Sequence, residues 1–347
     1  MLKELRSIEQ TTKNISVEAS CTILDKQPLF IIIIGESATK HHLGLYGYTR
    51  ETSAFTKEIS PLHIFHDVVS ASSATITALK AACTIQTSSS QTASLVDFFN
   101  SAGFKTELYS NQPTGGRYDS ALSYIFNNAQ KKYYSIKYGQ YVKEDGILLD
   151  KIISSIQEQT GPKVIFIHLF GSHADYIDRY PKSFSKFSGS DCIDNKSFIP
   201  TSKKIYAQTR INTYDNSILY TDHIISRIIE AAKNTSRYSY AIYFSDHGEE
   251  NYDFRDYSGR GGNNSNIIYD IPFIIWTSED FLQDHKNFFT DDIKNRQLYM
   301  KNFIPSVLQL SNISTDSINF ANSFFAHHPL QQQRYCDDRE YSTLIRQ

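Results

Sequence analysis

Acidic and imidazole side chains follow three apolar, strand-like segments of the sequence, at the points where the segments end. They are Glu36 after residues 29–34, His173 after residues 164–167, and Asp246 with His247 after residues 240–244. In an open α/β sheet, ligands bind beyond the carboxyl ends of the strands, so ends that are far apart in sequence can meet at one crevice. Carboxylates and imidazoles are ligands that zinc takes in proteins. The pattern therefore predicts one zinc-centred site suited to phosphoryl transfer.

Glu36 strengthens the prediction of a metal. Taken alone, a buried pair such as Asp246 and His247 is equally consistent with a structural hydrogen bond. Glu36, however, comes just after a run of isoleucines. A carboxylate buried there without a partner would cost roughly several kcal/mol, so it needs a cation or strong hydrogen-bond donors. Zinc would be such a partner.

A nucleophile is expected in the hydroxyl-rich segment 70–79. Zinc can lower the pKa of a hydroxyl group, and a helix that starts there favours the anionic phosphate under attack. The competing interpretation is an ordinary helix cap. Ser37 is a weaker candidate, because Thr39 stands where a nucleophile elbow would have its closing glycine.

The elements that must position these residues alternate along the chain. Strands are predicted at 29–34, 105–109, 164–169, 240–244 and 271–276, and helices at 91–100, 146–158 and 214–232. Such alternation predicts an α/β fold with a mostly parallel central sheet and helices on both faces. The stretch between Pro181 and Lys204 is rich in Ser, Lys, Asp and Pro and is expected to be a surface loop.

Composition excludes several classes of protein. The chain has 347 residues, 40% of them hydrophobic, and a formal net charge of −2. Without a dense Lys/Arg stripe, a nucleic-acid partner is not expected. The four cysteines are scattered, with no Cys-x-x-Cys pair. The longest apolar run is far below the roughly 20 residues that span a bilayer, and residues 1–20 are polar, so we expect a soluble chain without an export signal.

An ordered set of motifs resembles the catalytic domain of bacterial phosphoethanolamine transferases, members of the sulfatase-like alkaline phosphatase superfamily. The motifs are Gly35-Glu36-Ser37, Leu45-Tyr46-Gly47-Tyr48-Thr49-Arg50, Ser110-Asn111-Gln112, Gly171-Ser172-His173, Tyr214-Asp215-Asn216, Ser245-Asp246-His247-Gly248-Glu249 and Ile271-Pro272-Phe273. An ordered set is far more specific than any single motif. The resemblance covers residues 29 to about 310.

The resemblance implies one tightly held zinc ion, with Glu36, Thr75, Asp246 and His247 as its ligands, and leaves open a second and weaker zinc site. Thr75 would also be the nucleophile, with Ser73 and Thr77 left open as alternatives. The implied donor is phosphatidylethanolamine, and the acceptor is a lipopolysaccharide (lipid A or a core sugar) or another periplasmic glycan. The resemblance also implies that the catalytic domain is a monomer located at the inner membrane and facing the periplasm.

The resemblance also suggests residues that handle the substrate. His173 is expected to donate to phosphoryl oxygens, since the small residues Gly171 and Ser172 are expected to leave room for substrate beside it. Asn111 and Asn212 are expected either to orient substrate or to tie loops together. His168, inside its strand, is expected to be a packed core histidine.

Two departures from the family pattern stand out. These enzymes usually have a second histidine after the Asp-His-Gly-Glu motif, often following a glycine, whereas here Gly259 is followed by Arg260. An arginine at that position could bind phosphate oxygens but could not ligate a metal at neutral pH, so transfer would continue with altered substrate handling or be impaired. The transmembrane helices of the family are also missing. We therefore expect a lead-in over residues 1–28, a catalytic domain over 29–330 and a polar tail over 331–347.

Other functions stay open. A sulfatase is disfavoured, because the residues around Cys83 lack the Cys-x-Pro-x-Arg pattern of a formylglycine precursor. A phosphodiesterase or phosphatase would use the same zinc and threonine with water as acceptor. A non-catalytic remnant that binds a glycan or a partner is the alternative from another class.

Overall fold

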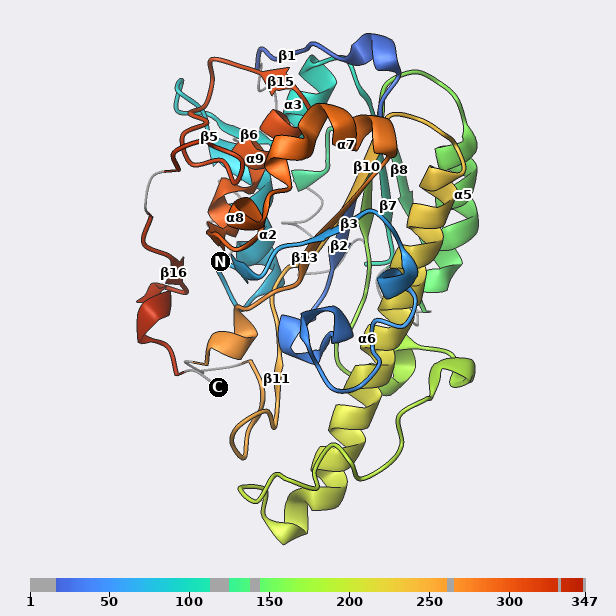
Figure 1. Cartoon of the computed structure of the whole chain (residues 1–347), viewed down its shortest axis with the longest axis vertical. Helices are drawn as coiled ribbons and strands as arrows, with labels where there is room; N and C mark the ends of the chain where they lie inside the picture. The colour runs from blue at the N-terminus through green and yellow to red at the C-terminus, as the bar shows by residue number, and fades with distance from the viewer. Residues whose placement is uncertain (1–16, 113–124, 138–143, 261–264, 330–331, 346–347) are drawn as a thin grey trace.

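A seven-stranded sheet forms the centre of the chain, in a computed structural model that describes residues 17–112, 125–137, 144–260, 265–329 and 332–345 (Figure 1). In spatial order the strands are β3 (Leu62–Ile64), β13 (Phe273–Thr277), β10 (Ser239–Ser245), β2 (Leu29–Gly35), β9 (Lys163–His168), β7 (Lys105–Ser110) and β8 (Lys131–Tyr134). The run from β10 to β8 is parallel, and only the pairings of β13 with β10 and β3 are antiparallel. The predicted mostly parallel sheet is confirmed.

The central strand β2 shows why the sheet is covered on both faces. All its side chains are buried, and they alternate between two apolar cores. Phe30, Ile32 and Ile34 belong to one core, and the residues between them belong to the other. A strand buried on both faces reads as a continuous apolar run, and successive side chains point to opposite faces.

Helices complete the two outer layers (Figure 1). The first core includes side chains from α2 (Thr75–Cys83), α3 (Leu95–Ser101), α7 (Glu279–His285), α8 (Asp291–Lys294) and α9 (Phe303–Leu310). The second core includes side chains from α5 (Leu149–Gln157) and α6 (Lys204–Lys233). None of the helices in the described ranges is long and apolar enough to span a bilayer.

Helix α6 is longer than the sequence predicts. It starts at Lys204, ten residues before the predicted start at Tyr214. Its first turns extend beyond the sheet, at the bottom of Figure 1, and there Ile205 and Tyr206 are 81% and 60% exposed. Because this part of the helix buries few side chains, its sequence lacks the apolar periodicity from which a helix is predicted.

Short two-stranded pairs surround the main sheet. They are β1 (Ser20–Cys21) with β15 (Ile313–Ser314), β4 (Asp67–Val69) with β14 (Gln297–Tyr299), β5 (Thr84–Gln86) with β6 (Thr92–Ser94), β11 (Glu250–Asn251) with β12 (Ser258–Gly259), and β16 (Tyr335–Cys336) with β17 (Arg339–Glu340). The first and last pairs bring the ends of the chain onto the core. The domain boundaries at residues 28 and 330 stay predictions. All four cysteines have free thiols.

Candidate metal centre and active site

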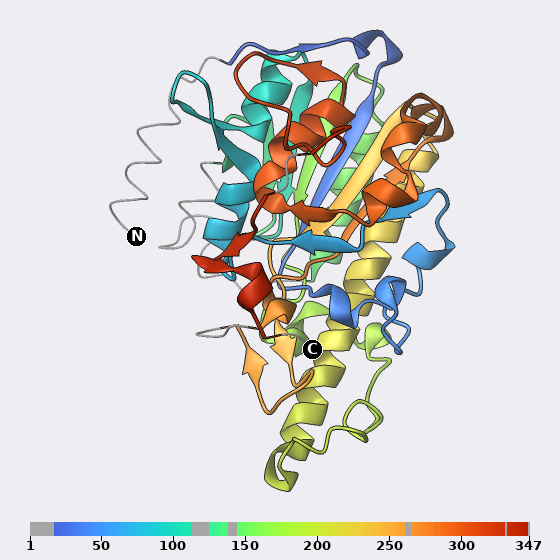
Figure 2. The ribbon, with the colours of Figure 1, turned by 60° about the vertical axis from the view of Figure 1, so that its left-hand side comes forward.

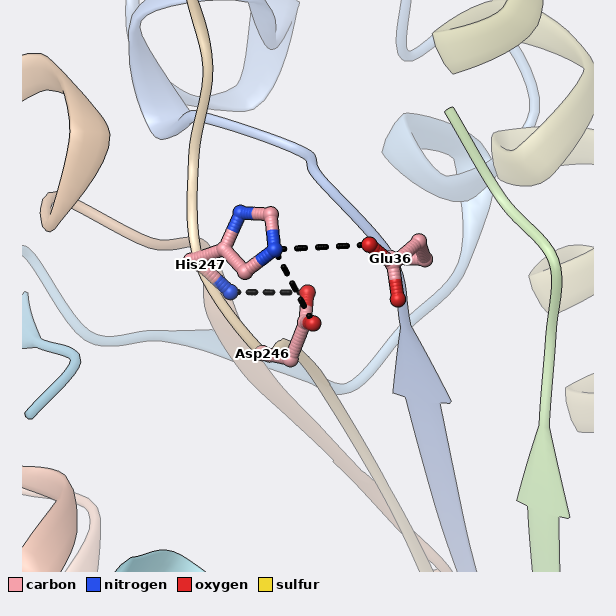
Figure 3. Close-up of side chains that lie close together, drawn as sticks. All are labelled: Glu36, Asp246 and His247. Atoms are coloured by element: carbon pink, nitrogen blue, oxygen red, sulfur yellow. Dashed lines mark hydrogen bonds and ion pairs between the residues drawn. The ribbon is translucent and has the colours of Figure 1, made fainter. Parts of the chain in front are cut away.

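Glu36, Asp246 and His247 meet beyond the carboxyl ends of the adjacent parallel strands β2 and β10. One ligand atom from each lies within 4.8 Å of the others, and all three side chains are buried. Figure 3 shows the His247 ring pointing toward both carboxylates: Nε2 lies 3.3 Å from Glu36 Oε1 and 3.2 Å from Asp246 Oδ2. The parallel register, which pairs Gly35 with Ser245, places the two strand ends at the same level. The predicted convergence is therefore confirmed for these two of the three strand ends.

The electrostatics of the cluster favour a bound cation. Burial would raise the pKa of Glu36, but the hydrogen bond and charge of His247, with the charges of His173 and Arg260, hold it well below its usual range. Burial and the nearby Glu36 charge raise the pKa of Asp246. Two buried carboxylates that compete in this way for one imidazole are stabilised together by a divalent ion.

The hydrogen bonds of the cluster leave suitable atoms for zinc. Asp246 Oδ1 accepts from the backbone N–H groups of Ser37 (3.0 Å) and His247 (2.8 Å), whereas its Oδ2 is buried and accepts no hydrogen bond. His247 Nδ1 lies 2.9 Å from the carbonyl oxygen of Gly248. A proton on Nδ1 donates to this carbonyl and leaves the Nε2 lone pair for a metal. The donor set fits zinc.

Thr75 brings a hydroxyl group to the same cluster. Its Oγ1 lies 3.1 Å from each carboxylate oxygen of Glu36 and 3.4 Å from His247 Nε2. Thr75 is the first residue of α2, and the N-cap, Ala74, provides no side-chain cap. For Thr75, the interpretation as an ordinary helix cap is therefore wrong.

The two alternative hydroxyls lie in other surroundings. Ser73 donates its hydroxyl to Asp337 Oδ2 at 2.6 Å, and Thr77 is exposed on α2. Within the segment 70–79, Thr75 is thus the residue placed beside Glu36 and His247.

Arg260 reaches the cluster from the residue after β12. Its Nη1 lies 3.4 Å from Glu36 Oε1 and also contacts His247 Nε2, the atom that would bind zinc, so the guanidinium group would have to move away from Nε2 when the metal binds. The Arg260 side chain is 33% exposed. The antiparallel pair β11–β12 follows the Asp246 loop and turns the chain back toward it. A partly exposed guanidinium group here can contact a phosphoryl oxygen.

His173 lies in the loop after β9. It is partly exposed, and its Nδ1 lies 2.6 Å from the carbonyl oxygen of Ala174, which leaves Nε2 for another partner. Its charge acts on Glu36, as described above.

The idea that Gly171 and Ser172 leave room for substrate is wrong. Both are buried, and Ser172 N–H donates to Glu36 O at 2.9 Å. A Cβ atom on Gly171, which has a φ of +52°, would lie 2.8 Å from the backbone nitrogen of Glu36. The space is filled by the backbone of Glu36.

Both asparagines make hydrogen bonds to other parts of the chain. Asn111 is fully buried, and its Nδ2 donates to Asp145 at 2.8 Å. Asn212 Nδ2 donates to the carbonyl oxygen of Gly189 at 3.0 Å. His168 is buried at the end of β9, as expected for a core histidine, and burial lowers its pKa to about 4.

Sequence analysis missed residues that shape the site. Tyr214 Oη donates to Ser37 O at 2.7 Å and accepts from Thr39 N–H at 3.0 Å, so it holds the turn after Glu36. Asp145 accepts from the backbone N–H groups of Phe170 (2.8 Å) and Gly171 (2.9 Å) and orders the loop that carries His173. Only Tyr214, which lies in one of the recognised motifs, had a signal in the sequence.

Comparisons with known proteins agree with this geometry. A sequence model described as Sulfatase matches residues 28–313. The chain is 31% identical over 303 residues to phosphoethanolamine transferase EptC of Escherichia coli K12, covering 82% of this chain and 51% of the relative. It is 30% identical over 289 residues to phosphoethanolamine transferase CptA of Salmonella typhimurium, covering 78% of this chain and 49% of the relative. The chain thus spans about half the length of the curated relatives it matches.

A solved structure matches nearly the whole chain. It is the C-terminal periplasmic domain of EptC from Escherichia coli in complex with Zn, at 26% identity and a TM-score of 0.83, covering 94% of this chain and 96% of that one. The predicted sulfatase-like fold is confirmed.

Proposed function

We propose that this chain, which belongs to the sulfatase family, is the catalytic domain of a zinc-dependent phosphoethanolamine transferase. The named relatives are phosphoethanolamine transferases, and the matched structure is a complex with zinc. Phosphatidylethanolamine is the proposed donor, and a lipopolysaccharide or another periplasmic glycan is the proposed acceptor. The domain would act as a monomer on the periplasmic side of the inner membrane, against the membrane surface that holds its lipid substrate.

The position of Thr75 carries this proposal. Its hydroxyl oxygen lies 3.1 Å from both Glu36 oxygens and 3.4 Å from His247 Nε2, at the start of a helix without a side-chain cap. Glu36, Asp246, His247 and Thr75 would hold the zinc ion. Zinc, when bound, lowers the pKa of a hydroxyl group and supplies positive charge beside the phosphoryl group.

In the first half-reaction, Thr75 Oγ1 bonds to phosphorus and the phosphorus–oxygen bond to diacylglycerol breaks. The threonine hydroxyl gives up its proton to solvent, and His173 Nε2, the proposed donor, gives a proton to the diacylglycerol oxygen. Arg260 binds a phosphoryl oxygen. In the second half-reaction, an acceptor hydroxyl or phosphate oxygen attacks the same phosphorus, and the bond from phosphorus to Thr75 Oγ1 breaks. A hydroxyl acceptor gives its proton to His173 Nε2, and Thr75 Oγ1 takes up a proton from solvent.

Intact mass spectrometry tests the first half-reaction. The purified chain is incubated with zinc and a phosphatidylethanolamine analogue in detergent, beside the variants Thr75→Ala, Ser73→Ala and Thr77→Ala. We expect one phosphoethanolamine group on the wild type and on the last two variants, and none on Thr75→Ala.

Two results would contradict the proposal. An adduct that persists in Thr75→Ala would move the nucleophile elsewhere. If the folded, zinc-loaded wild type forms no adduct, the proposed transferase function is refuted. If water hydrolysed the adduct as fast as the adduct is transferred to a glycan, the phosphodiesterase reaction would be favoured instead.

A further inference from the structure

A β-hairpin near the C-terminus lies against the segment that leads into Thr75. The hairpin consists of β16 and β17, with Asp337 and Asp338 in its turn. It lies outside residues 28–313, the part matched by the sulfatase model. Figure 2 shows this red segment beside the cyan helix α2, although more than 250 residues separate Ser73 from Asp337.

An apolar cluster anchors the hairpin. Its buried members are Val69, Ile268, Tyr269, Cys336, Tyr341 and Leu344. Val69 immediately precedes the hydroxyl-rich segment, so the cluster fixes the hairpin close to it. Arg334 pairs with Asp67, and the Tyr341 hydroxyl donates to Asp270. The hairpin is therefore held independently of its turn.

Asp337 makes the contacts from the turn to the segment. Its Oδ2 accepts from Ser73 N–H at 2.9 Å and from the Ser73 hydroxyl at 2.6 Å. Tyr269 Oη donates to the same oxygen at 3.0 Å, and Asp337 N–H donates to Ala71 O at 3.1 Å. Hydrogen bonds to a carboxylate are roughly twice as strong as neutral ones.

The opposite side of the segment is tied to the metal centre. The Ser70 hydroxyl donates to the backbone oxygen of Asp246, and Ser70 N–H donates to Tyr269 O at 2.9 Å. Ala74 gives α2 no side-chain cap, and the segment before the helix is held by these contacts and by a hydrogen bond within the segment, from Ala74 N–H to Ser72 Oγ at 3.2 Å. The position of Thr75 Oγ1 is thus set from both sides.

We infer that Asp337 is a positioning residue for the Thr75 nucleophile, holding the 70–75 segment through Ser73 and Ala71 so that Oγ1 stays beside Glu36. The inference rests on the proposed function of Thr75. Asp337 itself touches neither the substrate nor the cluster of metal ligands. Its effect is on the rate of the covalent step, because small displacements of a reacting group cost much of the advantage of orientation.

The test compares two adjacent alanine variants of the full chain. Asp337 and Asp338 both have positive φ, 46° and 67°, so alanine brings backbone strain at either position. We expect Asp337→Ala to lower the rate of adduct formation at saturating donor by about 10- to 100-fold, with KM and zinc content unchanged. Asp338→Ala should keep the wild-type rate. Asp337→Asn retains one acceptor oxygen and should recover part of the rate.

A second measurement does not depend on transfer. Hydrogen exchange of the backbone amides in residues 70–77 should become faster in Asp337→Ala and stay as in wild type in Asp338→Ala. If Asp337→Ala does not fold, the rate of adduct formation and the hydrogen exchange are measured on Asp337→Asn and Ser73→Ala instead, and these results test the inference.

Equal adduct rates and equal exchange in the Asp337 and Asp338 variants would overturn the inference. Failure of the proposed function would look different, because the wild type would then form no adduct. Hydrogen exchange would still decide whether Asp337 orders the segment.

Discussion

Raising the pH from 6.5 to 9 should destabilise this protein through one buried histidine, His42. Its Nδ1 lies 2.6 Å from Asp215 Oδ1, and its Nε2 lies 2.9 Å from Asp253 Oδ1. The His42 side chain is 3% exposed. Asp253 lies between β11 and β12.

The magnitude follows from the pKa of His42. Burial would lower it, but the charges of Asp253 and Asp215 and their hydrogen bonds raise it from 6.5 to about 9. A raised pKa stabilises the fold fully below 6.5, and this stabilisation is lost as the pH rises through 9. At about 1.4 kcal/mol per pKa unit, the free energy of unfolding should fall by about 3 kcal/mol over this window.

Urea denaturation at pH 6.5, 7.5 and 9 measures this loss, with a chelator in every sample because zinc binding also depends on pH. Asp253→Asn removes one charged partner, so its unfolding free energy should change less steeply with pH. His42→Gln cannot titrate and should lose the His42 contribution altogether. The reasoning is refuted if the wild type and His42→Gln show the same pH dependence.

Three further predictions concern the metal centre. Chelation should abolish adduct formation, and zinc restored at 100 times its Kd should raise the free energy of unfolding by about 2.7 kcal/mol, as calorimetry can show. Arg260→Ala should slow adduct formation about 10²-fold with zinc content unchanged; a loss of zinc by elemental analysis would instead make Arg260 a support of the metal centre. Gly171→Ala should weaken zinc binding and cost about 1–3 kcal/mol in urea denaturation, because its Cβ would lie 2.8 Å from Glu36 N. Gly47→Ala is the matched control, since that position also has positive φ but open space around it; an equal loss of zinc affinity in both variants would contradict this reasoning.

The central sheet and three members of the site could be predicted because their signals are local. The β2 segment is a continuous apolar run that ends at Gly35 and Glu36, and the β10 segment ends in the same way at Asp246. A carboxylate at the end of a buried strand needs a partner, so its position alone indicates chemistry. Parallel pairing then brings such ends together without any further information.

The roles of single polar residues could not be predicted in this way. Asn111 and Asn212 have the residue type of substrate ligands, yet their amides are used to bind Asp145 and Gly189. An asparagine has the same donors and acceptor in either role, so the sequence leaves the choice open. Gly171 similarly suggests space for substrate when the sequence is considered alone, but backbone atoms of Glu36 fill that space.

The position of the proposed nucleophile, Thr75, depends on contacts that the neighbouring sequence does not predict. Thr75 is held near Glu36 by a segment that bonds to Asp246 on one side and to Asp337 on the other. The sequence around Asp337 is polar, so residues 331–347 are predicted to be a tail. Its carboxylate matters only because an apolar cluster around Cys336 and Tyr341 brings it to Ser73. A site assembled from strand ends can therefore be found from sequence, while the alignment of its reacting atom depends on distant residues that only the folded chain brings into contact.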